Sequence, residues 1–181
     1  AVRRDAFMNR AFLDPLFKGS YPEEVEELFR PWILDDDLDR MSGRLDFIGV
    51  NYYTRLRVAA RKGAKLLDTT MTPVDRQAEV TAMGWEVCPQ GLTLQLERLH
   101  EELAHVPLYI TENGAAFDDA PGPDRPVDHP RRLHFIQRHL ASCPEALDAG
   151  VHLRGYFLSS LLDTFQGAEG SRHRFTTAPV A

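Results

Sequence analysis

Apolar residues along this chain alternate between strand-like and helix-like periods, and this alternation limits the folds open to it. Strand-like runs rich in β-branched and aromatic residues occur at 44–58, 107–111 and 151–163. Between them, at 88–105 and 128–150, apolar residues recur at steps of three and four, which is typical of helices. Strands that alternate with helices favour βα units and a parallel sheet. The sequence therefore predicts the α/β fold class.

Each helix-like segment also predicts its own buried face. Pro89 opens the first segment, and proline suits the first turn of a helix. The stripe expected to face the sheet in this segment comprises Leu92, Leu96, Leu99 and Leu103. The corresponding stripe of the second segment comprises Leu133, Ile136, Leu140, Cys143 and Leu147. Pro144 lies within the second segment, so we predict a kink or break there, at a cost of up to about 3 kcal/mol.

The remaining segments carry weaker patterns. Residues 21–30 begin with proline and acidic residues, which predicts a helix that Pro31 ends. Residues 59–82 are polar and lack a clear period, which predicts a long surface loop. A chain of 181 residues predicts one domain over 1–181. Three parallel strands would leave two open edges and a closed barrel needs eight strands, so the pattern alone predicts an incomplete α/β architecture or a small three-layer domain.

Charge and composition argue against several classes of partner. The 27 acidic and 21 basic residues give a net charge of −6, which disfavours nucleic acid. The short basic runs Arg131-Arg132 and Arg172-His173-Arg174 are expected to be solvated surface. No apolar run approaches the roughly 20 residues that span a membrane, so no membrane partner is expected. Cys88 and Cys143 form no CxxC pair and no segment resembles a signal peptide, which predicts reduced thiols and a cytoplasmic location.

Motifs for metals, cofactors and serine hydrolases are missing from the sequence. It contains no HExxH, no cysteine–histidine spacing of a zinc site, no GxGxxG and no P-loop. His129, His134 and His139 are spaced by five and do not share a helix face. Ser159-Ser160 lacks the GxSxG elbow. The sequence therefore predicts neither a metal nor a cofactor.

Polar residues end all three strand-like runs, where barrel-type α/β enzymes place their catalytic groups. The first run ends in Asn51-Tyr52-Tyr53, the second at Glu112, and the third near Ser159 and Asp163. Strands side by side would place Glu112 within reach of a tyrosine hydroxyl, which could orient the carboxylate as a nucleophile. The structural alternative is that an acidic residue before Asn113-Gly114 is a turn former.

Five segments in order resemble the C-terminal part of family 1 glycoside hydrolases, the β-glucosidase family. They are NRAFLDPLFKGSYPEE at 9–24, LDFIGVNYYT at 45–54, TAMGWEVCPQGL at 81–92, PLYITENGAAFDD at 107–119 and RGYFLSSLLDTFQGAEG at 154–170. The resemblance implies a partial (β/α)8 barrel, roughly its sixth to eighth strands with their helices. The tail at about 171–181 diverges from the family pattern after Arg174-Phe175.

The resemblance also implies roles for individual residues. Glu112 matches the glutamate that attacks the anomeric carbon in retaining hydrolysis. Tyr53 matches the tyrosine that hydrogen-bonds this nucleophile, and Asn51 matches a residue of the network around the sugar. Gln166 stands where the family has a glutamate that binds two sugar hydroxyls. Gly167 and Ser159 stand where it has tryptophans that contact the sugar.

The departures limit what the chain is expected to do. No Asn-Glu-Pro motif, which carries the acid/base glutamate in the family, occurs in the sequence. Replacement of tryptophan at 159 and 167 removes apolar faces on which sugars stack. The expectation is a fragment of a retaining β-glycosidase that is inactive by itself and needs a complementary N-terminal half, with a β-glucoside-like sugar as ligand. The alternatives are a non-catalytic remnant, a sugar-binding module, or a half-barrel that pairs with a second copy.

Overall fold

The chain forms two compact units in a computed structural model that describes residues 1–43, 45–64, 67–103, 106–118, 129–162, 170 and 173–176. The helical unit comprises Ala1–Leu45 and Leu56–Pro73, and the sheet unit comprises Asp46–Arg55 and Val74–Ala181. Length alone predicted one domain. In the structure the chain leaves the sheet unit after Arg55, contributes Leu56–Pro73 to the helical unit, and returns to the sheet unit at Val74.

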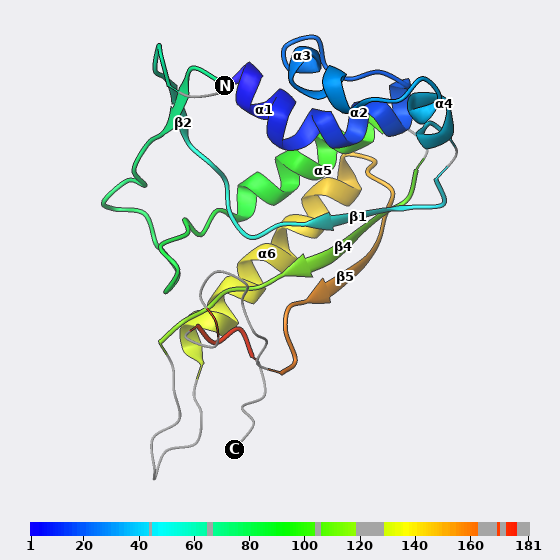
Figure 1. Ribbon diagram of the computed structural model, residues 1–181. Coiled ribbons are helices and arrows are strands. Elements are labelled where there is room, and N and C mark those ends of the chain that lie inside the picture. The colour runs from blue at the N-terminus through cyan, green and yellow to red at the C-terminus, as the bar shows by residue number, and fades with distance from the viewer. Residues whose placement is uncertain are drawn as a thin grey trace. The chain divides into compact units, whose positions relative to one another are not determined.

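Short helical turns and one small sheet make up the helical unit (Figure 1). In chain order they are α1 (Val2–Asp5), the π-helix η1 (Ala6–Arg10), α2 (Ala11–Lys18), α3 (Glu26–Phe29), the 3₁₀ helix η2 (Arg30–Trp32), α4 (Asp37–Met41), β2 (Val58–Ala60) and β3 (Thr69–Met71). The core of this unit comprises Ala6, Ala11, Val25 and Leu67, with Phe7, Tyr21, Leu28 and Phe29 packed against it.

Two predictions for this unit need correction. The helix predicted at 21–30 is only the single turn α3, and Pro31 lies inside η2 instead of following a helix. The segment 59–82, predicted as a loop, contains the antiparallel pair β2–β3. Each of these strands has three residues, which is too short for a period of two to be recognised.

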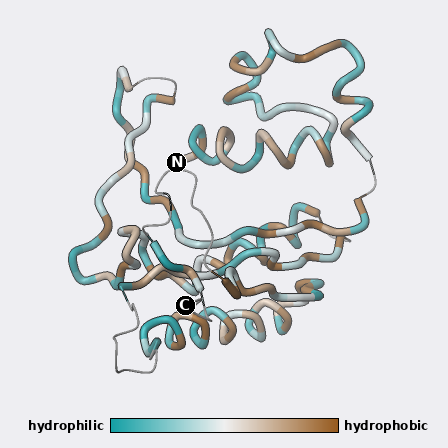
Figure 2. Tube along the Cα trace, turned by 60° about the horizontal axis from the view of Figure 1, so that its bottom comes forward, coloured by the Kyte–Doolittle hydropathy of each residue, from teal (hydrophilic) through white to brown (hydrophobic). Residues whose placement is uncertain are grey.

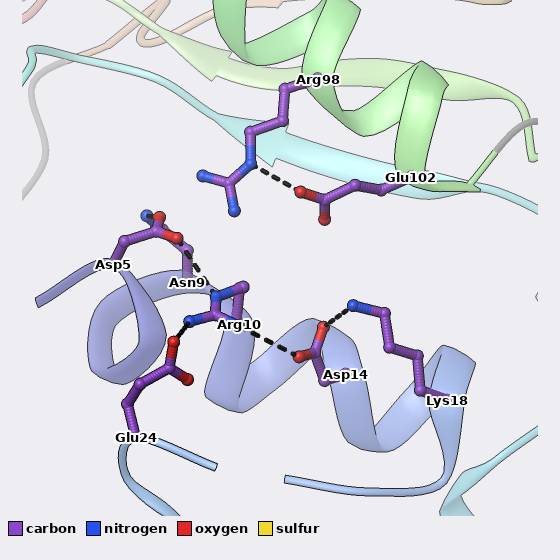
Figure 3. A network of polar contacts seen from close by, with 8 residues as sticks. All are labelled: Asp5, Asn9, Arg10, Asp14, Lys18, Glu24, Arg98 and Glu102. Carbon is purple, nitrogen blue, oxygen red and sulfur yellow. Dashed lines mark hydrogen bonds and ion pairs between the residues drawn. The ribbon is translucent and has the colours of Figure 1, made fainter. Parts of the chain in front are cut away.

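An ion-pair network lies around Arg10 in the helical unit (Figure 3). The Arg10 guanidinium contacts Glu24 at 2.7 Å, Asp5 at 3.3 Å and Asp14 at 4.0 Å. Lys18 also contacts the buried Asp14 at 2.8 Å. The hydrogen bond to Glu24 raises the pKa of Arg10, because it stabilises the charged guanidinium. The network joins the helical segment 1–18 to the turn before α3.

The sheet unit is built on three parallel strands in the order β1–β4–β5. They are β1 (Ile48–Asn51), β4 (Leu108–Asn113) and β5 (Leu153–Leu158), with α5 (Pro89–Leu103) and α6 (Pro130–Asp148) between them along the chain. Helices α5 and α6 pack together behind the sheet (Figure 1). This arrangement confirms the predicted α/β class. The strand predicted at 44–58 is divided between β1 and β2, which belong to different sheets.

The buried face of α5 is the predicted one, whereas of the five residues in the stripe predicted on α6 only Cys143 is buried and Ile136 is half-buried. Leu92, Leu96, Leu99 and Leu103 are all buried. On α6, Leu133, Leu140 and Leu147 are 56%, 44% and 49% exposed, and hydrophobic residues alternate with hydrophilic ones along this helix (Figure 2). The buried residues of α6 are Arg132, Phe135, His139, Ser142, Cys143 and Ala146. Small residues at 142 and 146 permit close helix packing, a preference that a leucine stripe does not reveal.

Pro144 does not break α6, which continues to Asp148. The N–H that proline lacks would have bonded the carbonyl of Leu140. Both residues lie on the exposed side of the helix, where solvent can satisfy that carbonyl. The predicted kink or break was therefore wrong, because its cost depends on which side of the helix carries the proline.

The basic pair Arg131-Arg132 was predicted to be solvated surface, but Arg132 is buried. Its side chain is 3% exposed, and it donates hydrogen bonds to the carbonyls of Ala115 and Arg174. The guanidinium groups of Arg131 and Arg132 lie 4.4 and 5.9 Å from the centroid of the Phe117 ring. Arg132 thus joins the segment after β4 to the segment at 174–176. Within the described residues, no helix combines the length and apolarity needed to cross a membrane.

Candidate active site

Glu112 lies inside strand β4 and not in a turn after it. The strand runs on to Asn113, whose carbonyl accepts a hydrogen bond from the backbone N–H of Ser159 at 2.9 Å. A Cβ atom at Gly114 would lie 1.7 Å from the carbonyl oxygen of Ser159. Gly114 is therefore required by the close approach of the segment after β5. This excludes the turn-former reading of Glu112.

Tyr53 donates a hydrogen bond from its hydroxyl to Oε2 of Glu112 at 2.8 Å. The two residues are 59 positions apart in the chain. The backbone carbonyl of Glu112 also accepts a bond from the N–H of Tyr52 at 2.9 Å, so the two strand ends are held together. Both the Tyr53 and Glu112 side chains are half-buried. The carboxylate is thus held by a directed donor in a partly desolvated setting, which suits a nucleophile.

The Tyr53 hydroxyl remains a neutral donor over the physiological pH range. Burial raises its pKa to about 12, and the bond to Glu112 acts in the same direction because it stabilises the protonated phenol. A hydrogen bond with the Ser159 side chain acts in the opposite direction. This interaction brings the predicted site residue Ser159 to Tyr53, and therefore to the same end of the sheet as Glu112.

Two further aromatic residues enclose Tyr53. Its ring makes edge contacts with Trp85 and Phe175, at centroid distances of 5.6 and 5.9 Å. Trp85 and Phe175 are 6.3 Å apart, and Phe175 is buried. The sequence reading missed both residues as site members. Trp85 could have been found within TAMGWEVCPQGL at 81–92, whereas Phe175 lies in the tail at about 171–181, at the last position before the predicted divergence.

Asn51 reaches the same end of the sheet but contacts a different residue. It is the register partner of Glu112, just beyond an irregularity in the β1–β4 ladder. Its side-chain oxygen accepts a hydrogen bond from the Thr111 hydroxyl at 2.8 Å. Gln166 and Gly167 lie outside the described residues, as does Asp163.

Asn113 connects the ends of all three strands beneath the site. Its side chain is fully buried, its amide nitrogen donates to the carbonyl of Tyr52 at 2.7 Å, and its oxygen accepts from the Tyr156 hydroxyl. These bonds lie where the regular register on both sides of β4 is interrupted. Asn113 therefore replaces ladder hydrogen bonds and supports the backbone that carries Glu112.

The donor set at this end of the sheet is a carboxylate, phenols, a hydroxyl and an amide. Among the residues that the structure describes, no three histidine, cysteine, aspartate or glutamate side chains lie together as metal ligands would. The arrangement can hold a carboxylate in a fixed direction beside aromatic surfaces. Attack on an electrophilic carbon by Glu112 is the chemistry that this geometry suits.

Comparison with known proteins points in one direction. The model of the family "Glycosyl hydrolase family 1" matches residues 1–180. Beta-glucosidase A of Thermotoga maritima is 39% identical over 167 residues, which cover 91% of this chain and 37% of that protein. The beta-glucosidase of an Agrobacterium species is 39% identical over 180 residues, covering 97% of this chain and 39% of the relative. The chain thus spans about two fifths of the length of these curated relatives.

Solved structures give the same result. A family 1 β-glucosidase from Thermotoga maritima superposes with a TM-score of 0.90 at 36% identity, covering 99% of this chain and 41% of that structure. The AHE enzyme from Alicyclobacillus herbarius also gives a TM-score of 0.90, at 38% identity, with 99% and 40% covered. Another Thermotoga maritima β-glucosidase structure, solved in complex with azafagomine, covers 99% of this chain and has 37% identity and a TM-score of 0.90.

Proposed function

This chain belongs to glycosyl hydrolase family 1, and on that premise we propose that it is part of a retaining β-glycosidase in which Glu112 is the nucleophile. The observation that carries the proposal is the Tyr53–Glu112 hydrogen bond at the end of the central strand β4. A carboxylate that is half-buried and held by a neutral donor has one oxygen directed and the other free to attack.

Retaining hydrolysis proceeds in two displacements. Glu112 attacks the anomeric carbon, the bond to the leaving-group oxygen breaks, and a covalent glycosyl ester forms on the Glu112 carboxylate. Water then attacks the same carbon, which releases the sugar and restores the carboxylate. Both steps need a second carboxyl group about 5–5.5 Å away, first as acid and then as base. The chain has no Asn-Glu-Pro sequence, so this group is supplied by residues outside it.

By itself the chain has no appreciable glycosidase turnover. General acid catalysis typically contributes about 10²- to 10⁴-fold, because an unprotonated leaving group is expelled slowly. Residues outside the chain also complete the sugar site. In the proposed whole enzyme, β1, β4 and β5 are the sixth to eighth strands of a (β/α)8 barrel. The parallel order and the helices between the strands support this assignment.

The remaining predicted residues border the sugar in this proposal. Asn51 belongs to the network beside Glu112, and Ser159 lies next to Tyr53. Ser159, Gln166 and Gly167 replace the charged and aromatic groups of the family pattern. Glutamine can still exchange hydrogen bonds but lacks the charge that strengthens them. We expect weaker sugar binding than in a relative with aromatic residues at 159 and 167.

The decisive test is complementation. The chain is mixed with a separately produced N-terminal segment of a family 1 β-glucosidase that ends where the region matching this chain begins, and nitrophenyl β-glucoside hydrolysis is measured. Activity above that of either piece is expected. Glu112→Gln provides the matched control, because it keeps the shape of the side chain and removes the nucleophile. A 2-fluoro-glycosyl inhibitor should label the wild-type chain at Glu112 in the mixture, as seen by peptide mass spectrometry. Absence of both activity and label would refute the proposal.

A second candidate, a non-catalytic sugar-binding module or remnant, is favoured by the changes at 159, 166 and 167. It predicts no gain in hydrolysis on complementation. Titration of the chain with glucose by calorimetry or NMR distinguishes a sugar-binding module from a remnant, since a module binds saturably and a remnant does not bind. Sedimentation tests whether a second copy takes part, because a half-barrel that pairs with itself would give a dimer.

A further inference from the structure

Arg55 and Glu86 form a two-pronged ion pair beside the candidate site. Arg55 donates from Nε to Oε2 of Glu86 at 2.9 Å and from Nη2 to Oε1 at 2.6 Å. The Glu86 side chain is buried, whereas that of Arg55 is 44% exposed. Because a guanidinium fork and a carboxylate are both planar, two parallel bonds fix the direction as well as the distance of the pair.

Three more contacts accompany this ion pair and join the same two segments. The Thr54 hydroxyl donates to the carbonyl of Glu86 at 2.9 Å, and the Tyr52 hydroxyl donates to the carbonyl of Cys88 at 2.7 Å. The Tyr53 ring packs edge-on against Trp85. Residues 52–55, which follow β1, are thus attached side chain by side chain to residues 85–88, which precede α5.

These contacts lie beyond the regular sheet. The described ladder between β1 and β4 ends at Asn51, and one further backbone bond, from Tyr52 to the Glu112 carbonyl, follows it. Tyr53 therefore has side-chain contacts instead of strand pairing to direct its ring. Among these contacts between residues 52–55 and 85–88, the Arg55–Glu86 pair has two charge-assisted hydrogen bonds. Such bonds are stronger than those between neutral groups.

We propose that Arg55 and Glu86 are positioning residues that hold the Tyr53 hydroxyl within hydrogen-bonding distance of Glu112. The catalytic meaning of this role rests on the proposed function of Glu112, but the structural claim can be tested without any turnover. Loss of the fork frees residues 52–55 from the loop at 85–88. The Tyr53 ring then moves away from Trp85, and its hydroxyl leaves the Glu112 carboxylate.

The ionisation of Tyr53 reports this movement specifically. Burial, Ser159 and Glu112 set its pKa, whereas the charges of Arg55 and Glu86 act on the neighbouring Tyr52. Loss of the positive charge of Arg55 would by itself raise the pKa of a nearby phenol, so a fall in the Tyr53 pKa in Arg55→Met would arise from displaced geometry. Release of the ring lowers its pKa from about 12 towards the ordinary 10.

The experiment measures Tyr53 in the whole chain by NMR with ¹³Cζ-labelled tyrosine, with the resonance assigned through Tyr53→Phe. At pH 11, about 10% of Tyr53 should be ionised in the wild type, and this fraction should rise in Arg55→Met, up to about 90% where the ring is fully released and its pKa returns to 10. A second readout at pH 7 is quenching of Trp85 fluorescence by acrylamide in a Trp32→Phe background, which should increase in the same variant. Glu86→Gln should change both signals in the same direction.

Arg98→Met is the matched control, because it removes an ion pair with Glu102, at 2.8 Å, that lies within the single helix α5 (Figure 3). This control should leave both signals unchanged. Arg55→Lys retains the charge but offers a single nitrogen, so it should give intermediate signals; it also replaces Arg55→Met if that variant does not fold. Wild-type signals in a folded Arg55 variant would overturn the proposal. If the variants change these signals but complementation fails, the result counts against the proposed glycosidase function and not against the positioning role of Arg55 and Glu86.

Discussion

His139 should make the sheet unit unstable in mild acid. Its ring is fully buried between Phe135, with a centroid distance of 3.9 Å, and Tyr52, at 6.1 Å. Nδ1 lies 2.8 Å from the Phe135 carbonyl, which can only accept, so Nδ1 carries the proton. Nε2 is buried and has no hydrogen-bond partner among the described residues. A second proton would therefore create a buried charge with an unpaired N–H.

The magnitude follows from the pKa. Burial lowers the pKa of His139 from 6.5 to about 4, with nearby Arg138 acting in the same direction. Above pH 6.5 the ring is neutral whether the chain is folded or unfolded, so its contribution to stability is fully present. Between pH 6.5 and about 4 only the unfolded chain takes up the proton, so stability falls as the pH falls. At about 1.36 kcal/mol per pH unit, the loss is about 3 kcal/mol.

The assay is urea unfolding followed by the fluorescence of Trp85 in a Trp32→Phe background, because Trp85 lies in the same unit as His139. His139→Phe keeps a ring but cannot titrate. The free energy of unfolding of the wild type relative to this variant should fall by about 3 kcal/mol between pH 7.5 and pH 4. His134→Phe, at an exposed position of the same helix, should retain the wild-type pH profile. A difference that stays constant with pH would refute the reasoning.

Four other substitutions test the packing of the sheet unit by urea unfolding. Asn113→Leu removes the partner of the Tyr52 carbonyl and of the Tyr156 hydroxyl, and at about 1–3 kcal/mol each we expect a loss of about 2–6 kcal/mol; a loss below 1 kcal/mol would contradict this. Gly114→Ala places a methyl group 1.7 Å from the Ser159 carbonyl, so the segment after β5 must move, at a cost of about 1–3 kcal/mol or more; unchanged stability would show that the approach is looser. Leu140→Ser, on the exposed side of α6, should change stability by less than about 0.5 kcal/mol, whereas Leu96→Ala on α5 should cost about 2–5 kcal/mol; equal effects would mean that the faces are wrongly assigned.

Helix α6 shows where local sequence patterns reach their limit. Its leucines form a regular stripe, and a second set of positions, including Phe135 and Ala146, is the one that packs inward. Both sets recur with a helical period, so the period alone could not choose between them. The choice depends on how closely α6 can approach its neighbours, which is a property of the packed unit. The stripe of α5 had no such competitor, and its burial was predicted correctly.

The candidate site divides in a similar way. The ends of the strand-like runs indicated Glu112 and Tyr53, and the family resemblance assigned their roles. Neither assigned a role to Trp85, Phe175 or the Arg55–Glu86 pair, because the role of each depends on contacts between distant segments. Their contacts with residues 53–55 join positions that are more than 30 residues apart in the chain.

The sequence by itself determined the α/β class, the order of strands and helices in the sheet unit, the inward face of α5 and the family resemblance, because periodicity and motifs are local properties of the chain. Only the tertiary structure decided that Gly114 serves a close approach instead of a turn, that Arg132 is buried, and that Trp85 and Phe175 lie against Tyr53. Each of these depends on which distant backbone lies alongside. That information exists only once the strands have paired and the loops around them have packed.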